Sequence, residues 1–468
     1  MVFHHEADTC GQVNSRRGAE ELRGRGEEAQ RGRGAVLGRR MGERRRVNKT
    51  SDNYPNSSSP LLAHSSAPPP PGSSASARLS RSTIIIGLVS LLGDISSEMI
   101  YPILPTFLTQ TLHAPATIVG LIEGFAVGTA SVVSGFSGWI SDTIRRRKPV
   151  AFVGYALTAV SRPMISFATA WPVVLGARFG DRFGKGIRTA PRDALLAESA
   201  AESSRGRAFG FERAMDSAGA VLGPLLGLAL VAWAGFEARK IFLISAIPAS
   251  IAAVMILAVR ERRSDIVAGS SSIRISLAGT TREYRRLLIV TAVFGLANSA
   301  NAFLILRAQQ LGLTVGLTIV AYALYNAVAS MASVPAGSAS DRFGRRNLLI
   351  IGYAIYAVSY AGFALANATW LVWPLFAFYG LFPALTDGVS KALAVDTAGK
   401  SGRATAIGIY SAVIGITQIA ASYIGGMLWD HVDSRATFYF GAALAAAAAV
   451  LALTIIPPGV SGTNHQKS

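Results

Sequence analysis

Residues 84–110 read IIIGLVSLLGDISSEMIYPILPTFLTQ, a long apolar run that contains two acidic residues. About twenty helical residues, each rising 1.5 Å, span the roughly 30 Å hydrocarbon core of a bilayer. The run therefore predicts a helix that crosses a membrane. Asp94 and Glu98 lie four positions apart inside it, and a charge at that depth costs about 3 kcal/mol unless it faces water or an opposite charge. We expect a polar path beside this helix.

The same alternation of long apolar runs and short polar breaks continues to about residue 458. It predicts an all-α polytopic membrane protein with twelve transmembrane helices. The spans are expected near 84–110, 115–140, 148–168, 171–197, 206–232, 238–259, 285–309, 314–339, 347–367, 370–395, 403–428 and 436–457.

The longest polar interruption follows the sixth span, which divides the chain into two six-helix bundles. We expect these bundles at 83–260 and 285–458, joined by a cytoplasmic central loop at 261–284. Residues 1–80 are rich in Arg, Gly, Ser and Pro, a composition typical of a disordered tail. Residues 459–468 are expected to form a short cytoplasmic tail.

Composition excludes several classes of protein. The chain is 50% hydrophobic and 15% charged, which is typical of membrane proteins. Its net charge of +18 lies in the tail and in the loops after spans two, six, eight and ten, so it indicates cytoplasmic termini in a cell (inner) membrane rather than nucleic-acid binding. One cysteine, Cys10, and no histidine inside a span argue against a metal site, a cofactor or an enzyme. We expect a monomer surrounded by lipid.

An internal repeat supports the division into halves. The loop after span two contains Gly138-Trp-Ile-Ser-Asp142, and the loop after span eight contains Gly337-Ser-Ala-Ser-Asp341. An arginine cluster follows each copy. Parallel repeats of six helices are a recurring architecture of transporters.

At these residues the chain resembles the major facilitator superfamily, over nearly everything after residue 83. The second loop matches the superfamily signature in full, whereas the first has Thr143 and Arg145 where Arg and Gly are usual. The resemblance implies that these loops latch the two halves together on the cytoplasmic side. The residues expected to form this cytoplasmic gate are Gly138, Asp142, Arg146, Arg147, Gly337, Asp341, Arg342, Gly344, Arg345 and Arg346.

A second motif lies in span five, where Gly219, Gly223, Pro224 and Gly227 resemble the motif of proton-coupled antiporters that export small molecules. Leu228 stands where a final glycine is usual. The same residues are also consistent with a closely packed, kinked helix that carries no information on direction. Residues 178–197, together with GDISSEMIYPILP in span one, resemble an uncharacterised bacterial subgroup of the superfamily.

The candidate functional residues are charges inside the spans. In the superfamily fold, spans one, four, seven and ten line the central cavity, and most of these charges lie there. We expect proton coupling at Asp94, Glu98 and Asp216. We expect substrate binding at Tyr101, Arg178, Asp181, Arg182, Lys185, Glu212, Arg213, Arg307, Asp387 and Lys391.

These charges suggest a mechanism. An acid on span one that faces an arginine on span four can take up a proton and so free the arginine for an anionic group. We therefore expect Asp94 or Glu98 to carry the coupling proton, and the substrate to be an organic anion or a zwitterion.

Structural roles compete with these assignments. Asp181 is expected to pair with Arg178 or Arg182, and Glu212 with an arginine of span four, as static ion pairs. Glu123 lies in a small-residue stripe and is equally consistent with a structural hydrogen bond. Arg162 precedes Pro163 and is a candidate to satisfy backbone carbonyls that the kink frees.

The function expected from these patterns is proton-coupled transport of a small organic solute by alternating access, with efflux preferred because of the span-five motif. Proton-coupled uptake of an organic anion is the alternative. A membrane sensor of the same fold that binds a solute without moving it is the third possibility.

Overall fold

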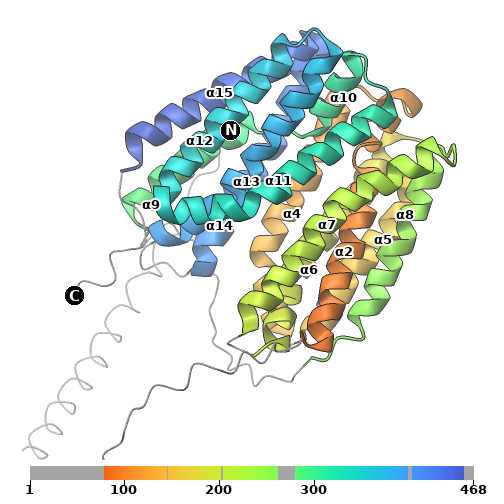
Figure 1. The fold of residues 1–468 in the computed structure, drawn as a ribbon, viewed down its shortest axis with the longest axis vertical. Helices are drawn as coiled ribbons and strands as arrows, with labels where there is room; N and C mark the ends of the chain where they lie inside the picture. Colours follow the sequence, from red (N-terminus) through yellow and green to blue (C-terminus); the bar gives the residue numbers. More distant parts are fainter. Residues whose placement is uncertain (1–78, 145, 202–203, 262–279, 399–402, 458–468) are drawn as a thin grey trace, which may run out of the picture. The chain divides into compact units, whose positions relative to one another are not determined.

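A computed structural model describes residues 79–144, 146–201, 204–261, 280–398 and 403–457. These residues form helices and short connections, with no strand among them. The two expected tails and most of the expected central loop lie outside the described residues. Figure 1 shows the helices of the first half on one side of the bundle and those of the second half on the other.

The twelve expected spans are confirmed. The first six are α2 (Arg81–Ile100) continued by α3 (Leu104–Thr106) and η1 (Phe107–Thr111), α4 (Ala116–Ile144), α5 (Arg147–Ser166), α6 (Trp171–Ser199), α7 (Arg205–Ala232) and α8 (Ala238–Ile256). The second six are α9 (Arg282–Ala297) continued by α10 (Ala302–Gln310), α11 (Val315–Phe343), α12 (Arg345–Leu365), α13 (Val372–Thr397) preceded by η3 (Thr369–Leu371), α14 (Arg403–His431) and α15 (Ser434–Ile455).

Ten of these spans are long and apolar enough to cross a membrane by themselves. The exceptions in the described part are α5 and α6. Charged side chains recur along α6 from Arg178 to Asp193, and they lower its hydropathy. Such a helix is stable at membrane depth only when its charges face protein or water.

Six alternate helices begin with an arginine at the same end of the bundle, which we call the arginine-rich end. These residues are Arg81, Arg147, Arg205, Arg282, Arg345 and Arg403. A cation is disfavoured at a helix N-terminus by the helix dipole. These arginines therefore do not stabilise their helices. Their shared position is instead consistent with the charge bias that orients helices in a membrane.

The first span of each half is broken near its middle. The first break spans Tyr101–Ile103, where Pro102 has no backbone N–H to donate. The second lies at Asn298–Asn301, between α9 and α10. Broken helices leave backbone groups free inside the protein, and in transporters they mark the region of a binding site.

Glycines allow α7 to lie directly against α2. A Cβ on Gly223 would come within 3.0 Å of the Ile95 carbonyl oxygen, and one on Gly227 within 2.9 Å of the Met99 carbonyl oxygen. The stripe in span five therefore packs helices within the first half, as small residues do between membrane helices.

Two helix pairs join the halves. Glycines of α4 face α14, with Gly124 against Ser422 and Gly128 against Ile419. The second pair is α7 with α11, where the Asn326 amide donates to the Ala220 carbonyl (3.0 Å). Farther toward the arginine-rich end, a Cβ on Gly210 of α7 would meet no atom within 4 Å.

The facing part of α11 is equally open. Met331 and Val334 are each 79% exposed, and Gly337 has open space where a Cβ would stand. At the opposite end the two halves touch, because the Gln309 amide donates to the Thr106 hydroxyl (2.6 Å). The seam between α7 and α11 is therefore closed at one end and open at the arginine-rich end.

We expect Gly227→Ala to lower the free energy of unfolding by about 1–3 kcal/mol, since the added methyl group has to displace the α2 backbone. Gly210→Ala is the matched control, because it lies in open space and gains helix propensity. Thermal unfolding in detergent measures both. Equal melting temperatures for the two variants would contradict the close packing of α7 on α2.

Candidate functional site

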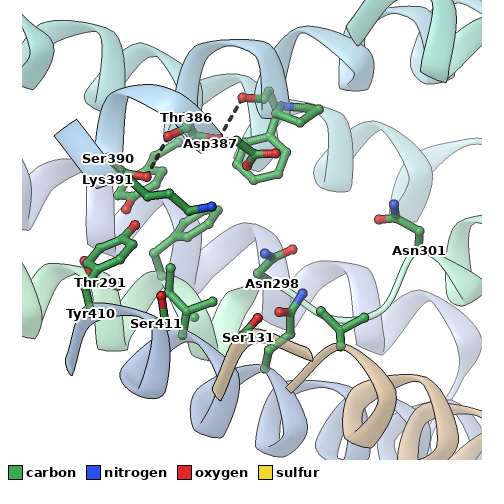
Figure 2. A pocket seen from close by; sticks show the side chains of 18 of the residues that line it. Ser131, Thr291, Asn298, Asn301, Thr386, Asp387, Ser390, Lys391, Tyr410 and Ser411 are labelled. Carbon is green, nitrogen blue, oxygen red and sulfur yellow. Dashed lines mark hydrogen bonds between the residues drawn. The ribbon is translucent and has the colours of Figure 1, made fainter. Parts of the chain in front are cut away.

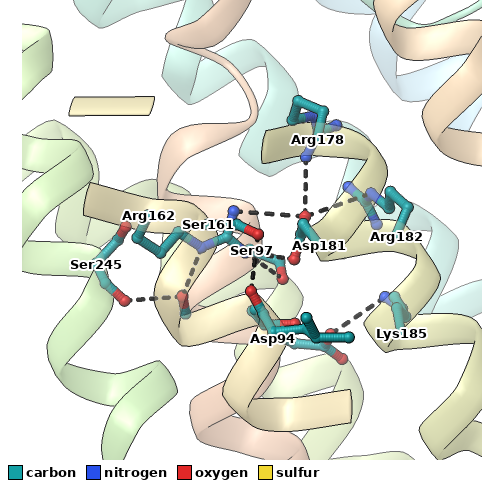
Figure 3. A network of polar contacts seen from close by, with 12 residues as sticks. Asp94, Ser97, Ser161, Arg162, Arg178, Asp181, Arg182, Lys185 and Ser245 are labelled. Carbon is teal, nitrogen blue, oxygen red and sulfur yellow. Dashed lines mark hydrogen bonds and ion pairs between the residues drawn. The ribbon is translucent and has the colours of Figure 1, made fainter. Parts of the chain in front are cut away.

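Charged side chains of α6 recur every three or four residues, so they lie on one face of the helix. That face points toward α2, α4 and α5. Figure 3 shows the side chains of Arg178, Asp181, Arg182 and Lys185 turned toward Asp94 and Arg162. The polar path expected beside span one is therefore built mainly by α6.

The deepest part of the site is a buried ion network of Glu123, Arg162, Arg178, Asp181 and Arg182. The Arg178 guanidinium donates to both oxygens of Glu123, at 2.9 and 2.7 Å. Its third nitrogen lies 3.2 Å from Asp181, which also accepts from Arg162 (3.2 Å) and lies 3.7 Å from Arg182. The expected pairing of Asp181 with Arg178 and Arg182 is confirmed.

The interpretation of Arg162 as a partner for freed carbonyls is wrong. Its guanidinium donates to the hydroxyls of Ser96 (3.1 Å) and Ser97 (3.0 Å) and to Asp181. Side-chain acceptors on α2 and α6 thus outcompete the backbone near Pro163, because a carboxylate binds a guanidinium more strongly than a neutral carbonyl does. Arg162 ties α5 to both helices.

A second set of ion pairs lies closer to the arginine-rich end. Arg192 of α6 lies 3.0 Å from Glu212 of α7, as expected for a static pair, and 3.0 Å from Asp193. Arg213 is largely exposed and lies 3.8 Å from Asp216 and 4.0 Å from Glu212. Of this set, Arg213 has the most exposed side chain (71%).

A charged cluster lies where α2, α6 and α7 meet, and its members are Asp94, Lys185 and Asp216. The Lys185 ammonium lies 3.4 Å from Asp94. Asp216 lies one turn of α7 before Gly219, where an added Cβ would come within 3.0 Å of the Asp94 side chain. The side chains of Lys185 and Asp216 are 38% and 33% exposed, so water reaches the cluster.

Glu98 lies next to this cluster and contacts the other half of the molecule. Its carboxylate accepts a hydrogen bond from the Tyr322 hydroxyl of α11 (2.9 Å). The ring of Tyr322 stacks on Tyr101, with centroids 5.2 Å apart, and the Arg178 guanidinium lies over the other ring at 5.9 Å. Tyr322 was not expected as a site residue, since the two tyrosines of span eight, Tyr322 and Tyr325, carry no charge pattern.

Glu98 also differs from the other carboxylates of the first half in that it lacks a described cationic partner. Each of the other described carboxylates inside the first six spans has a cation within 4.0 Å. These are Asp94, Glu123, Asp181, Asp193, Glu198, Glu212 and Asp216. Glu98 has a hydroxyl donor but no such cation among the described residues.

A cavity of about 330 Å³ lies on the side of the second half that faces α4. Figure 2 shows Asp387 and Lys391 of α13 at its wall, with Asn298 and Asn301 from the break between α9 and α10. Both charges are exposed in the cavity, and neither has a hydrogen-bond or ion-pair partner among the described residues. The structure thus brings the expected residues Asp387 and Lys391 together.

Aromatic rings form much of the cavity wall, and they were not expected as site residues. The members are Phe294, Tyr325, Tyr353, Tyr379, Phe382 and Tyr410. The spacing of Tyr353, Tyr356 and Tyr360 at three and four residues was a visible signal of one aromatic helix face, from which Tyr353 lines the cavity.

The structure does not bring Arg307 to the other expected site residues. Its guanidinium donates to the carbonyls of Phe363 (3.1 Å) and Ala366 (2.9 Å), near the end opposite the arginine-rich one. It serves there as a partner for the last carbonyls of α12.

The loops expected to form the gate are partly described. Arg345 pairs with Asp396, Arg346 donates to the Leu453 carbonyl, and Arg147 pairs with Glu198. All three contacts stay within one half. Gly344 ends α11 with φ of +84°, a conformation that favours glycine. Asp341 and Arg342 are exposed, and Arg146 is the last residue of the first loop. The surroundings of Gly138 and the side chain of Asp142 lie outside the described part.

Asp430 joins the two halves at the end opposite the arginine-rich one, and the sequence did not reveal this contact. Its carboxylate accepts from the backbone N–H groups of Ala116 (3.0 Å) and Thr117 (2.7 Å) and from the Thr117 hydroxyl (2.6 Å). A residue at the end of α14 thus caps the N-terminus of α4 in the other half, where a negative charge is favourable.

Within the described ranges, no group of three or more His, Cys, Asp or Glu side chains could hold a metal ion.

We expect Glu123→Ala to destabilise the protein by about 3–5 kcal/mol, because it leaves Arg178 buried without its bidentate partner. Arg213→Ala is the control, since exposed ion pairs contribute at most about 1 kcal/mol. Thermal unfolding compares the two. A loss of stability as large in Arg213→Ala as in Glu123→Ala would argue against the buried ion network as a structural centre.

We expect Asp430→Ala to raise about fivefold the fraction of molecules in which the two halves are separated at this end, because the loss of a helix cap costs roughly 1 kcal/mol. Labelling of Leu306→Cys by a membrane-impermeant maleimide, in a Cys10→Ser background, measures this opening. Asp433→Ala is the control, because Asp433 caps α15 within its own half. Unchanged labelling in Asp430→Ala would show that the cap does not hold the halves together.

Known proteins match this fold and sequence. The model of the Major Facilitator Superfamily matches residues 86–296 and 287–468. An uncharacterized MFS-type transporter of Methanocaldococcus jannaschii is 33% identical over 383 residues, which are 81% of this chain and 95% of that protein.

Two further proteins are similar. The class G tetracycline resistance protein of Vibrio anguillarum is 27% identical over 311 residues, 63% of this chain and 77% of that protein. The crystal structure of a D-xylose-proton symporter superposes with a TM-score of 0.64 at 17% identity, over 80% of this chain and 97% of that one. At that identity the second similarity shows the fold alone.

Proposed function

The chain belongs to the major facilitator superfamily, and we propose that it is a secondary active transporter that carries a small organic solute by alternating access. One observation carries this proposal. The halves touch through Gln309 and Asp430 at one end of the seam, whereas α7 and α11 are open at the other. Charged side chains that water reaches lie between these ends.

The arginine-rich end is the cytoplasmic end in this proposal. Positive residues remain on the cytoplasmic side of a membrane, and six helices begin with arginine at this end. Both termini are then cytoplasmic, the protein lies in the cell (inner) membrane, and the described conformation is open to the inside. Rocking of the halves would break the contacts of Gln309 and Asp430 and open the outside.

Proton coupling is assigned to Glu98 first, with Asp94 and Asp216 beside it. Among the described residues Glu98 has no cation within 4.0 Å, so it gains a proton without breaking an ion pair. A protonated Glu98 gains an O–H donor that needs an acceptor of its own, and the hydrogen bond that it accepts from Tyr322 in the other half becomes a weaker bond between neutral groups. The protonation state of one carboxylate is thereby linked to the contact between the halves.

Efflux is the preferred direction, and uptake of an organic anion is the alternative. A relative is named for tetracycline resistance, and the glycine stripe of α7 resembles an exporter motif. The stripe also packs α7 on α2, so the preference for efflux rests on the named relative rather than on the stripe.

We expect Glu98→Gln to abolish proton-driven flux in proteoliposomes while solute exchange without a proton gradient continues. The neutral amide keeps the size of the side chain but cannot exchange a proton. The measurement is the pH change inside liposomes on addition of tetracycline, benzoate or L-tryptophan, one probe for each class of solute.

Glu237→Gln is the matched control, since Glu237 is exposed at the start of α8 and outside the site. Proton-driven flux that survives in Glu98→Gln, and likewise in Asp94→Asn, would contradict this assignment. Binding of a probe without flux or exchange by the parent chain would favour a sensor over a transporter.

A further inference from the structure

We propose that the cavity of the second half binds a small aromatic zwitterion, a solute with a ring, an ammonium group and a carboxylate. This inference rests on the proposed function, because it names the solute class for that transporter. It is carried by two opposite charges inside an aromatic cavity, neither of which has a hydrogen-bond or ion-pair partner in the described part of the chain.

The charges come first. Asp387 and Lys391 lie one helical turn apart on α13 and both face the cavity (Figure 2). A pair at this spacing can form a salt bridge on a helix. Here the two are more than 4.0 Å apart, as no ion pair joins them, and no other described residue pairs with either. Each is therefore available for an opposite charge of the solute.

The charged side chains of the first half are less available to a solute. Arg162 and Arg178 are fully buried and each donates to a carboxylate, so an incoming anion would have to displace a bidentate or bridged partner. Such displacement leaves a buried carboxylate without its cation, which is costly. The free charges of α13 are thus better placed to select the solute than the paired arginines of the first half.

The rings of the wall favour a planar solute. Phe294 stacks on Tyr353 with centroids 3.9 Å apart, and Tyr325 stacks on Tyr379 at 5.3 Å. Phe382 is tilted against Phe294 at 5.4 Å. Aromatic pairs at such distances add to the affinity beyond the area that they bury. A solute ring between these pairs would continue the stacks.

Amide groups complete the site. The Asn301 side chain is held by two tyrosines, since Tyr379 donates to its oxygen (2.8 Å) and its nitrogen donates to Tyr325 (3.4 Å). The side chains of Asn298 and Gln418 line the cavity without a hydrogen-bond partner among the described residues. The volume of about 330 Å³ lies in the usual range for small-molecule sites.

The test is calorimetric binding to the purified full chain with four probes. L-tryptophan has all three features, tryptamine lacks the carboxylate, indole-3-propionate lacks the amine, and L-leucine lacks the ring. We expect L-tryptophan to bind at least tenfold more tightly than tryptamine and indole-3-propionate, since one charge-assisted hydrogen bond is worth about that factor. We expect the same preference over L-leucine, since the indole ring buries more apolar area and stacks on the rings of the wall. A probe lacking one feature that binds as tightly would overturn the solute class.

Two variants assign the charges. Asp387→Asn is expected to weaken L-tryptophan about tenfold and to leave indole-3-propionate unchanged. Lys391→Gln is expected to weaken L-tryptophan to the same extent and to leave tryptamine unchanged. The unchanged probe in each case shows that the variant is folded. Equal binding of L-tryptophan by the parent chain and both variants would overturn the proposal.

The binding assay and the flux assay test the solute class and the transport function independently of each other. A chain that binds L-tryptophan but moves no solute supports this inference and contradicts the transporter. A chain that moves tetracycline or benzoate but does not bind L-tryptophan supports the transporter and contradicts the aromatic zwitterion.

Discussion

Asp181 is the carboxylate on which the first half depends. Three guanidinium groups lie within 3.7 Å of it, from α5 and from both sides of its own position on α6. Arg178 extends the network to Glu123 on α4, and Arg162 extends it to the serines of α2. Since every one of these groups is buried, moving one helix away from the others would leave a charge without a partner at membrane depth. The four helices are therefore expected to move as one body.

The two halves use polar residues in different ways. In the first half nearly every charge is paired, and the pairs hold helices. In the second half Asp387 and Lys391 line a cavity with a wall of stacked rings, and no residue that the structure describes pairs with either charge. Tyr322 connects the two parts, because it reaches from α11 to Glu98 and stacks on Tyr101. A rigid half that carries protonatable groups and a second half that carries free binding groups would divide coupling and recognition between them.

The fold could be predicted from the sequence almost completely. Apolar runs placed the helices within a few residues, for example 171–197 against α6 at Trp171–Ser199, because a membrane allows few alternatives to a helix. The charged stripe of α6 was visible from its spacing, and so were its static pairs. The position of Arg307, the partners of Arg162, and the roles of Tyr322 and Asp430 were not. Each depends on which side chains meet across many helices, and helical periodicity gives the face of a residue but not its partner.

The cap of α4 by Asp430 has a consequence for how the chain is assembled. The amide groups of Ala116 and Thr117 are made early in synthesis, but their acceptor follows about three hundred residues later, at the end of the eleventh span. Until then these amides have only water, lipid head groups or the translocation machinery as partners. The first six spans are thus incomplete as an isolated fragment, and a gene split in the central loop would have to bring both products together before the beginning of α4 is satisfied.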